Sequence, residues 1–394
     1  MANDPSSSAT PVSPAVPAAL PAGLVRRIGL VLGLSLLSVL LIGTLLNGFF
    51  RGENIRRLFA SPIGPVHWTM LIAALAVHLA GLGFEAVLLK ILSAAIGKPA
   101  RFIAMLRVYL AGNIGAQITP SAVGGEPAQL FLLARDGYPL AESSFLLSVR
   151  GFLSVAARVL LLAAFALIAV PAAIGPASKA WNIAAAVTAA LLILFYAALF
   201  LFFYTSRIRT GVARVAAKYP ILYRPFRCRN AREFEEKCGG FALRFRSLMI
   251  FVVREQKAAL AAGLLASLLS WVAVKSAPFF VMRAFGQDPS WLLVIAAGIM
   301  SQVASGWAPT PGAVGAAEAA MAAFFLPLVT RGDPAVLIPV FILIFRFFDL
   351  PLNIVVGGAL LPGFFRSPKA RAPIPGGKIA IPRETRFVRP PENG

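Results

Sequence analysis

Long apolar segments alternate with short polar or basic segments over most of the chain. Six apolar segments are long enough for the ~20 residues that a helix needs to cross the hydrocarbon core of a bilayer. These predicted spans cover about residues 28–46, 66–92, 143–170, 181–204, 258–280 and 335–361. The first one follows two arginines and is also compatible with a signal peptide, but its length and the lack of a clear cleavage site favour an uncleaved span. The pattern predicts an all-α, polytopic membrane protein.

Two further apolar regions, 103–135 and 291–328, are interrupted near their centres by proline and glycine. Proline in a helix interior removes a hydrogen bond and clashes with the preceding turn. Neither region is therefore expected to cross the membrane as one helix. We expect each to form a pair of half-helices, a re-entrant or broken pair, beside the six full spans.

The composition excludes a soluble globular protein. Of the 394 residues, 58% are hydrophobic and 13% are charged, with a mean hydropathy of +0.79, whereas soluble domains have about a quarter of their residues charged. The two cysteines and two histidines form no disulfide framework and no metal-ligand spacing. We therefore expect no metal, no cofactor and no catalytic residue.

Three regions follow from the distribution of polar residues. Residues 1–25 are rich in serine, proline and alanine and are expected to form a disordered tail. Residues 26–363 form the predicted transmembrane domain, and residues 364–394 form a basic, proline-rich C-terminal tail.

Positive charge is concentrated in a few segments between or beyond the spans. The net charge is +21; the segment 206–257 carries thirteen Lys or Arg against four Glu, and the tail carries seven against two. Such segments face the cytoplasm by the positive-inside rule, which predicts a plasma (inner) membrane protein with both termini cytoplasmic. The arginines at 51, 56 and 57 depart from this topology, which places them outside. Basic segments beside a bilayer attract anionic lipid headgroups, a better explanation of the charge than nucleic-acid binding.

An internal repeat is the most informative feature. Residues 119–124 read Thr-Pro-Ser-Ala-Val-Gly and residues 310–315 read Thr-Pro-Gly-Ala-Val-Gly, at an offset of 191. A glutamate follows each motif, and one apolar span precedes and another follows each. Repeat one therefore covers about 66–170 and repeat two about 258–362, on either side of the basic 206–257 loop. Because the span at 181–204 adds one unpaired crossing, the repeats are expected to be inverted, a common plan of membrane transporters.

Each Thr-Pro pair has the features of a helix start, with threonine at the N-cap and proline at the first helical position. A half-helix that begins at membrane depth directs unpaired N–H groups toward a cavity, which suits a phosphate or carboxylate. The glycines allow close approach of the backbone to a ligand or to another helix. A purely structural joint between helices is the alternative for both motifs.

Several ionisable residues fall within or beside apolar spans, where a charge is costly and needs a partner. We predict Glu126–Arg150 and Glu318–Arg346 (or Asp349) as coupled pairs near the midplane, either structural or in competition with a substrate. Glu85 and Lys275 lie at nearly equivalent places of the two repeats with opposite charge, and each is expected to act as a charge partner for other ionisable residues of the site, while His78 is interpreted as a core residue. The candidate substrate-binding residues are Thr119, Pro120, Gly124, Gly125, Glu126, Arg150, Arg158, Thr310, Pro311, Gly312, Gly315, Glu318, Arg346 and Asp349.

The stretch 112–127, which begins with Gly112-Asn113-Ile114-Gly115 and ends with the run from Thr119 to Pro127, resembles the lysylphosphatidylglycerol synthase transmembrane family, and residues 311–318 are similar to that family's second motif. The resemblance covers about 66–362 and implies lipid translocation, or a supporting role in making an envelope lipid such as a phospholipid, glycolipid or hopanoid. Ser121-Ala122 and Ala313 replace glycines that the family often has, so these joints are expected to be less flexible. About thirty polar residues follow the last span, so the synthase activity is not expected here.

Three functions compete. The first is a flippase-like transporter, not an enzyme, that moves a lipid with an anionic or polar headgroup between leaflets. The second is a non-transporting partner of lipid-biosynthesis enzymes, and a homodimer is a further expected assembly. The third is a membrane-embedded transferase, for which the sequence offers no nucleophile–base pair and no metal cluster.

Overall fold

The computed structural model describes residues 66–169 and 231–360, apart from positions 121, 307, 309 and 350, and the isolated positions 190 and 194. The described ranges are helical and contain no strand. Four stretches are long and apolar enough to cross a membrane: Trp68–Ala95, Leu140–Phe165, Lys257–Ala284 and Pro334–Gly357. They confirm four of the predicted spans as apolar helices, while the predicted spans at 28–46 and 181–204, like both predicted tails, lie outside the described residues.

Apart from α10, the described helices form two similar sets that follow each other along the chain. The first set consists of α3 (Trp68–Ala95), α4 (Phe102–Ile118), α5 (Gly125–Arg135) and α6 (Leu140–Ala169). The second consists of α11 (Lys257–Ala284), α12 (Trp291–Ser305), α13 (Ala316–Phe325, extended by η2 Leu326–Leu328) and α14 (Pro334–Asp349) with its continuation α15 (Pro351–Leu360). Each broken region thus forms two separate helices. The second helix of each pair, α5 or α13, rises only 1.5 Å per residue and is too short to cross a ~30 Å core.

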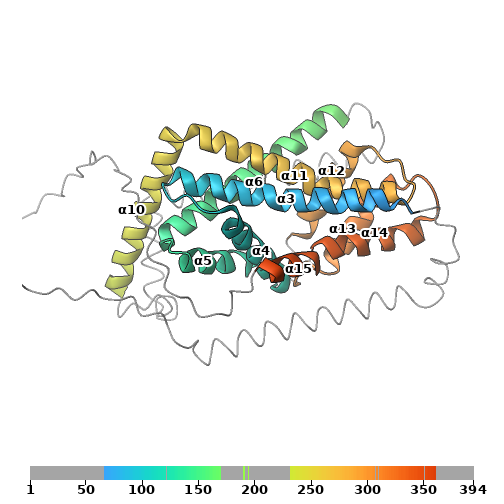
Figure 1. Cartoon of the computed structure of the whole chain (residues 1–394). Coiled ribbons are helices and arrows are strands. Elements are labelled where there is room, and N and C mark those ends of the chain that lie inside the picture. The colour runs from blue at the N-terminus through green and yellow to red at the C-terminus, as the bar shows by residue number, and fades with distance from the viewer. Residues whose placement is uncertain are drawn as a thin grey trace, which may run out of the picture.

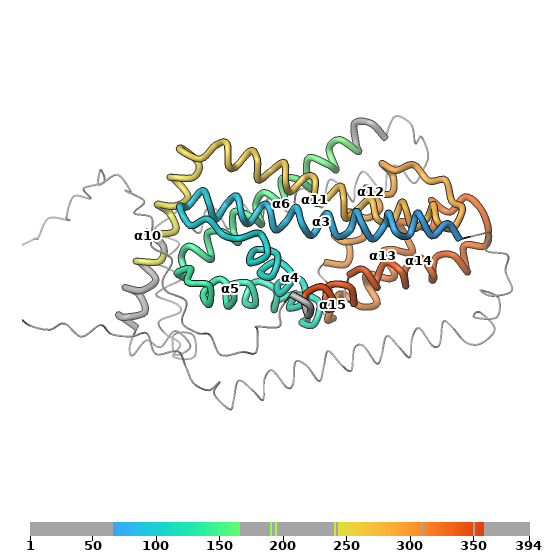
Figure 2. The backbone as a smooth tube through the Cα atoms, in the orientation of Figure 1, coloured from blue at the N-terminus to red at the C-terminus, as the bar shows by residue number. Residues whose placement is uncertain are grey.

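The helices α3 and α11 pack against each other along their length and run in opposite directions (Figures 1 and 2). The backbone N–H of His67 donates to the carbonyl of Ala284 at one end, and Gly263 lies beside Leu88 toward the other. At the centre Gly81 faces Ser270, whose hydroxyl donates to the Gly81 carbonyl at 2.9 Å. Small residues at such a crossing let two helices in lipid approach closely.

Two apolar clusters occupy opposite ends of the α3–α11 pair. One includes Leu89, Met105 and Phe145 and joins α3, α4 and α6; the other includes Val281, Phe325 and Phe341 and joins α11, α13 and α14. Figure 1 shows α4 and α5 toward one end of the long helices and α12 and α13 toward the other. The two short-helix pairs therefore approach the middle of the molecule from opposite ends.

Part of the segment predicted as a basic loop is a helix, α10 (Ala231–Glu255), which crosses one end of the bundle (Figure 1). Phe245, Leu248 and Val252 on α10 are buried in the first apolar cluster. Glu142 at the start of α6 pairs with Arg244 at 3.0 Å and with Lys98 at 2.6 Å. These contacts attach α10 to the end of the first helix set.

Candidate functional site

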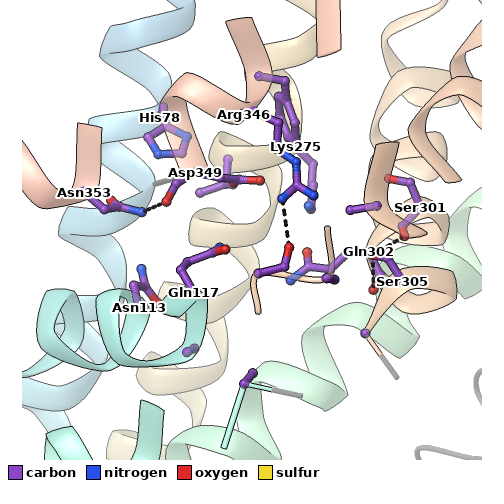
Figure 3. Close-up of a pocket in the computed structure, with 18 of the residues that line it drawn as sticks. His78, Asn113, Gln117, Lys275, Ser301, Gln302, Ser305, Arg346, Asp349 and Asn353 are labelled. Carbon is purple, nitrogen blue, oxygen red and sulfur yellow. Dashed lines mark hydrogen bonds between the residues drawn. The ribbon is translucent and has the colours of Figure 1, made fainter. Parts of the chain in front are cut away.

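A polar cavity of about 340 Å³ lies where the two helix sets meet. Its walls come from both sets, and Figure 3 shows side chains of both approaching it. Its polar and charged lining residues are His78, Glu85, Tyr109, Asn113, Gln117, Arg150, Ser154, Ser270, Trp271, Lys275, Ser301, Gln302, Ser305, Thr310, Arg346, Asp349 and Asn353. Polar groups at this depth of an apolar helix bundle indicate a cavity that holds water or a polar ligand.

The two repeated motifs meet at this cavity. Pro120 and Pro311, which are equivalent in the repeat, lie opposite each other in an isolated antiparallel bridge. Gly312 also lies so close to Gln117 that an added Cβ would be 2.9 Å from the amide oxygen of Gln117. The tip of each short-helix pair thus contacts the tip of the other.

The Thr-Pro pairs do not start helices, so that prediction is wrong. Thr119 follows the last residue of α4 in an extended conformation, and α5 begins only at Gly125. In the second set α13 begins at Ala316. The proline at each tip instead keeps the chain out of the helix at the point where the two tips meet, because its ring lacks the N–H that a continued helix needs.

Thr119 fixes the first tip from within. Its hydroxyl donates to the Gly115 carbonyl at 2.7 Å and accepts from the Gly124 N–H at 2.8 Å. Gly124 and Gly125 pack against the backbone and small side chains of α4, where an added Cβ on Gly124 would lie 2.7 Å from the Gly115 oxygen. These glycines therefore serve close packing of α5 on α4.

The second tip is held by its glutamate. Glu318 accepts from the Gly315 N–H at 2.6 Å and so caps its own half-helix, while the Thr310 hydroxyl donates to the Val314 carbonyl at 2.9 Å. One of the helix N-terminal donors expected to bind a ligand is thus already used by the protein. At the first tip, likewise, the Gly124 N–H donates to the Thr119 hydroxyl.

The backbone at both tips is left-handed at equivalent positions. Ala122 has φ of 57° and Ala313 has φ of 54°, and in the second tip Gly312 (58°) and Gly315 (84°) are left-handed as well. For alanine this conformation costs roughly 1–2 kcal/mol. The two alanines that stand where a glycine was expected are therefore strained, and they are strained at the place where the tips meet.

The predicted Glu318–Arg346 pair is present. Arg346 Nε donates to Glu318 Oε1 at 2.6 Å, and Arg346 Nη1 donates to the Gly312 carbonyl at 3.0 Å. The arginine thereby joins α14 to the tip and to the first turn of α13. Asp349, the alternative partner, lines the cavity one turn further along α14.

Glu126 and Arg150 do not form the predicted ion pair, although Glu126 acts on Arg150 electrostatically. Arg150 Nε donates to Glu85 Oε2 at 2.7 Å, and its guanidinium lies 4.8 Å from the ring centroid of Tyr109. Glu126 is exposed in the first turn of α5 and is not part of the cavity lining. Helix α3 supplies the counter-charge instead, through Glu85.

Of the two expected charge partners, Glu85 is confirmed as the partner of Arg150, whereas Lys275 is in no ion pair within the described part of the chain. Lys275 on α11 is buried and lies over the rings of Trp271, at 5.5 Å, and Phe345, at 5.9 Å. Arg158 also contacts this indole, 4.8 Å from the Trp271 ring centroid, and its Nε donates to the Ser154 carbonyl. Lys275 lines the cavity, whereas Arg158 does not.

His78 was assigned to the core, yet it lines the cavity. It is only 2% exposed, its ring lies 5.4 Å from that of Phe348, and neither ring nitrogen has a hydrogen-bond partner. The sequence held a signal for it, because His78 and Glu85 are seven residues apart and lie on one face of a helix. The same spacing rule applies to Asn113 and Gln117, four residues apart on α4.

Comparison with known proteins gives a consistent picture. Residues 27–357 match the family described as the lysylphosphatidylglycerol synthase TM region. The chain is 25% identical over 281 residues to a UPF0104 membrane protein of Archaeoglobus fulgidus, covering 71% of this chain and 82% of the relative. It is 29% identical over 232 residues to a UPF0104 membrane protein of Methanothermobacter thermautotrophicus, covering 56% and 63% respectively. No solved structure matches the chain.

Proposed function

Since this chain belongs to the lysylphosphatidylglycerol synthase TM region family, we propose that it is a membrane lipid transporter. It moves a lipid with an anionic or polar headgroup between leaflets, and it is not an enzyme. The observation that carries the proposal is the antiparallel contact of Pro120 with Pro311 beside a charged cavity. A site built where two similar units meet is the arrangement that alternating access requires.

The two helix sets form inverted repeats in this proposal. The same element order, the opposite directions of α3 and α11, their mid-helix contact at Gly81 and Ser270, and the meeting of the equivalent prolines Pro120 and Pro311 support it. Rocking of one set against the other at these contacts would open the cavity to one leaflet at a time.

The cavity size fits a headgroup. A volume of about 340 Å³ lies within the range of roughly 300–1,000 Å³ that is typical of small-molecule pockets. That space accommodates a polar headgroup while the acyl chains stay in the surrounding bilayer. Orientation follows from charge: α10 and the basic segment around it face the cytoplasm of the inner membrane and its anionic lipids.

The test is lipid movement in proteoliposomes. Fluorescent phospholipids are quenched from outside with dithionite, and the fraction that becomes accessible over time is compared between empty and protein-containing vesicles. We expect wild type and Glu126→Gln to accelerate movement equally, since Glu126 is exposed. Glu318→Gln is expected to slow it, because that change removes the partner of Arg346 and the cap of α13.

Failure of wild type to move any lipid contradicts the proposal. If the protein then still co-purifies with lipid-biosynthesis enzymes, the non-transporting partner is the better assignment. Turnover of a lipid by the purified protein alone would favour the transferase.

A further inference from the structure

The two arginines of the cavity are already neutralised by carboxylates. Arg150 holds Glu85 at 2.7 Å and Arg346 holds Glu318 at 2.6 Å. The Glu85 side chain is only 3% exposed, so separating its pair would leave a buried charge without compensation. An anionic ligand therefore gains little net charge attraction from either arginine.

Lys275 differs from both. It is 5% exposed and reaches the cavity from α11, and in the described part of the chain no carboxylate oxygen lies within 4.0 Å of its Nζ. Its ammonium lies over the rings of Trp271 and Phe345, and Asp349 in the same cavity acts on it electrostatically without a direct ion pair. A lone ammonium at this depth is costly unless a ligand compensates it.

Two further donors without an acceptor line the same cavity. Neither ring nitrogen of His78 on α3 has a partner, and Arg346 on α14 has one buried amino group, Nη2, without one. Figure 3 shows His78, Lys275 and Arg346 with Asp349 in one part of the cavity. Buried donors left unpaired cost free energy, so their presence together indicates an acceptor-rich ligand.

We infer that Lys275, Arg346 and His78 form a site for a singly charged oxyanion, namely the phosphodiester of a lipid headgroup. Lys275 supplies a positive charge that, among the described residues, is not held in a direct ion pair, and the other two donate hydrogen bonds to the phosphoryl oxygens. Asp349 lies close enough to repel a second negative charge, so a phosphomonoester is disfavoured. The assignment of a lipid as the source rests on the transport function proposed above.

The first test is equilibrium binding to the purified full chain in detergent, with short-chain phosphatidylglycerol as the probe. Lys275→Met is expected to weaken binding at least about tenfold, the loss typical of one charge-assisted hydrogen bond. Lys275→Arg restores most of the affinity, and Lys90→Met, a lysine exposed on α3, leaves it unchanged. Wild-type affinity in Lys275→Met, or no binding by wild type, overturns the inference.

A gain-of-affinity variant removes misfolding as an explanation. Asp349→Asn is expected to tighten phosphodiester binding several-fold and to bring the affinity for short-chain phosphatidic acid, a phosphomonoester, closer to it. Water-soluble glycerophosphoglycerol separates the two sources of a phosphodiester: equal affinity for it identifies a free headgroup, and clearly weaker binding identifies a lipid. Unchanged discrimination between diester and monoester in Asp349→Asn contradicts the site.

The outcomes separate this inference from the transport proposal. Lys275-dependent binding by a protein that moves no lipid in vesicles leaves the oxyanion site standing and rejects transport. If Lys275→Met moves both phosphatidylglycerol and a neutral, phosphate-free lipid at wild-type rates, the transport function stands and the oxyanion site is rejected.

Discussion

The buried pair of Glu85 and Arg150 offers a quantitative test of how the first helix set is held together. In Arg150→Gln the Glu85 carboxyl group, 3% exposed, is left buried without its partner. Removal of one member of a buried pair typically costs about 3–5 kcal/mol. In Glu85→Gln the arginine is left, but its side chain is 20% exposed and also lies over Tyr109, an interaction worth roughly 0.5–2 kcal/mol. Arg150→Gln should therefore be the more destabilising of the two.

The assay is a double-mutant cycle in mixed detergent, with unfolding followed by tryptophan fluorescence. In Glu85→Gln/Arg150→Gln neither charge remains, so the double variant should lose less than the sum of the singles by about 2 kcal/mol or more. A matched cycle of Glu126→Gln with Arg150→Gln should show weaker coupling than the cycle of Glu85 with Arg150, because Glu126 is exposed and makes no direct ion pair with Arg150. Additive effects of Glu85 and Arg150, or stronger coupling of Arg150 to Glu126, refute the described pairing.

Two other changes probe the backbone. Ala122→Gly and Ala313→Gly remove left-handed strain at the tips and should each raise the free energy of unfolding by about 0.5–1 kcal/mol in the same assay. The control Ala319→Gly, on the exposed face of α13, should lower it by ~1 kcal/mol. A lower free energy of unfolding in both tip variants would contradict the strain. Gly81→Ala puts a Cβ 2.4 Å from the Val274 side chain, and this overpacking of ~1–3 kcal/mol should lower the thermal unfolding midpoint. In the control Gly83→Ala the new Cβ meets only the Phe102 ring, at 3.8 Å, and the midpoint should stay unchanged. Equal midpoints for the two variants would contradict the close crossing of α3 and α11.

Much of the fold was predictable because its signals are local. A run of apolar residues defines each long helix, and proline with glycine marks each break, so the four described spans and both short-helix pairs follow from the pattern. The repeat adds the order of elements. Helix α10 was not predicted, since a basic composition alone does not reveal an apolar face such as that of Phe245, Leu248 and Val252.

The site was predictable only in part, because partners are chosen by three-dimensional proximity. The Glu318–Arg346 pair follows from the repeat, but its counterpart in the first set does not: Arg150 takes Glu85, which lies 65 residues away on another helix. Likewise Thr-Pro is typical of a helix start, yet here the extended tips contact each other and the helices begin several residues later. His78 reads as a core residue until its unpaired nitrogens are placed beside the cavity.

Crosslinking of the two tips tests the central claim most directly. Cysteines at Pro120→Cys and Pro311→Cys, in a background with Cys228→Ser and Cys238→Ser, would lie opposite each other in an antiparallel bridge, where Cα atoms are roughly 4.5–5.5 Å apart and a disulfide is allowed. The account predicts that the disulfide forms under mild oxidation, that it stops lipid movement in proteoliposomes, and that reduction restores it. Failure of the disulfide to form, or full lipid movement by the crosslinked protein, would contradict two units that meet and move at these tips.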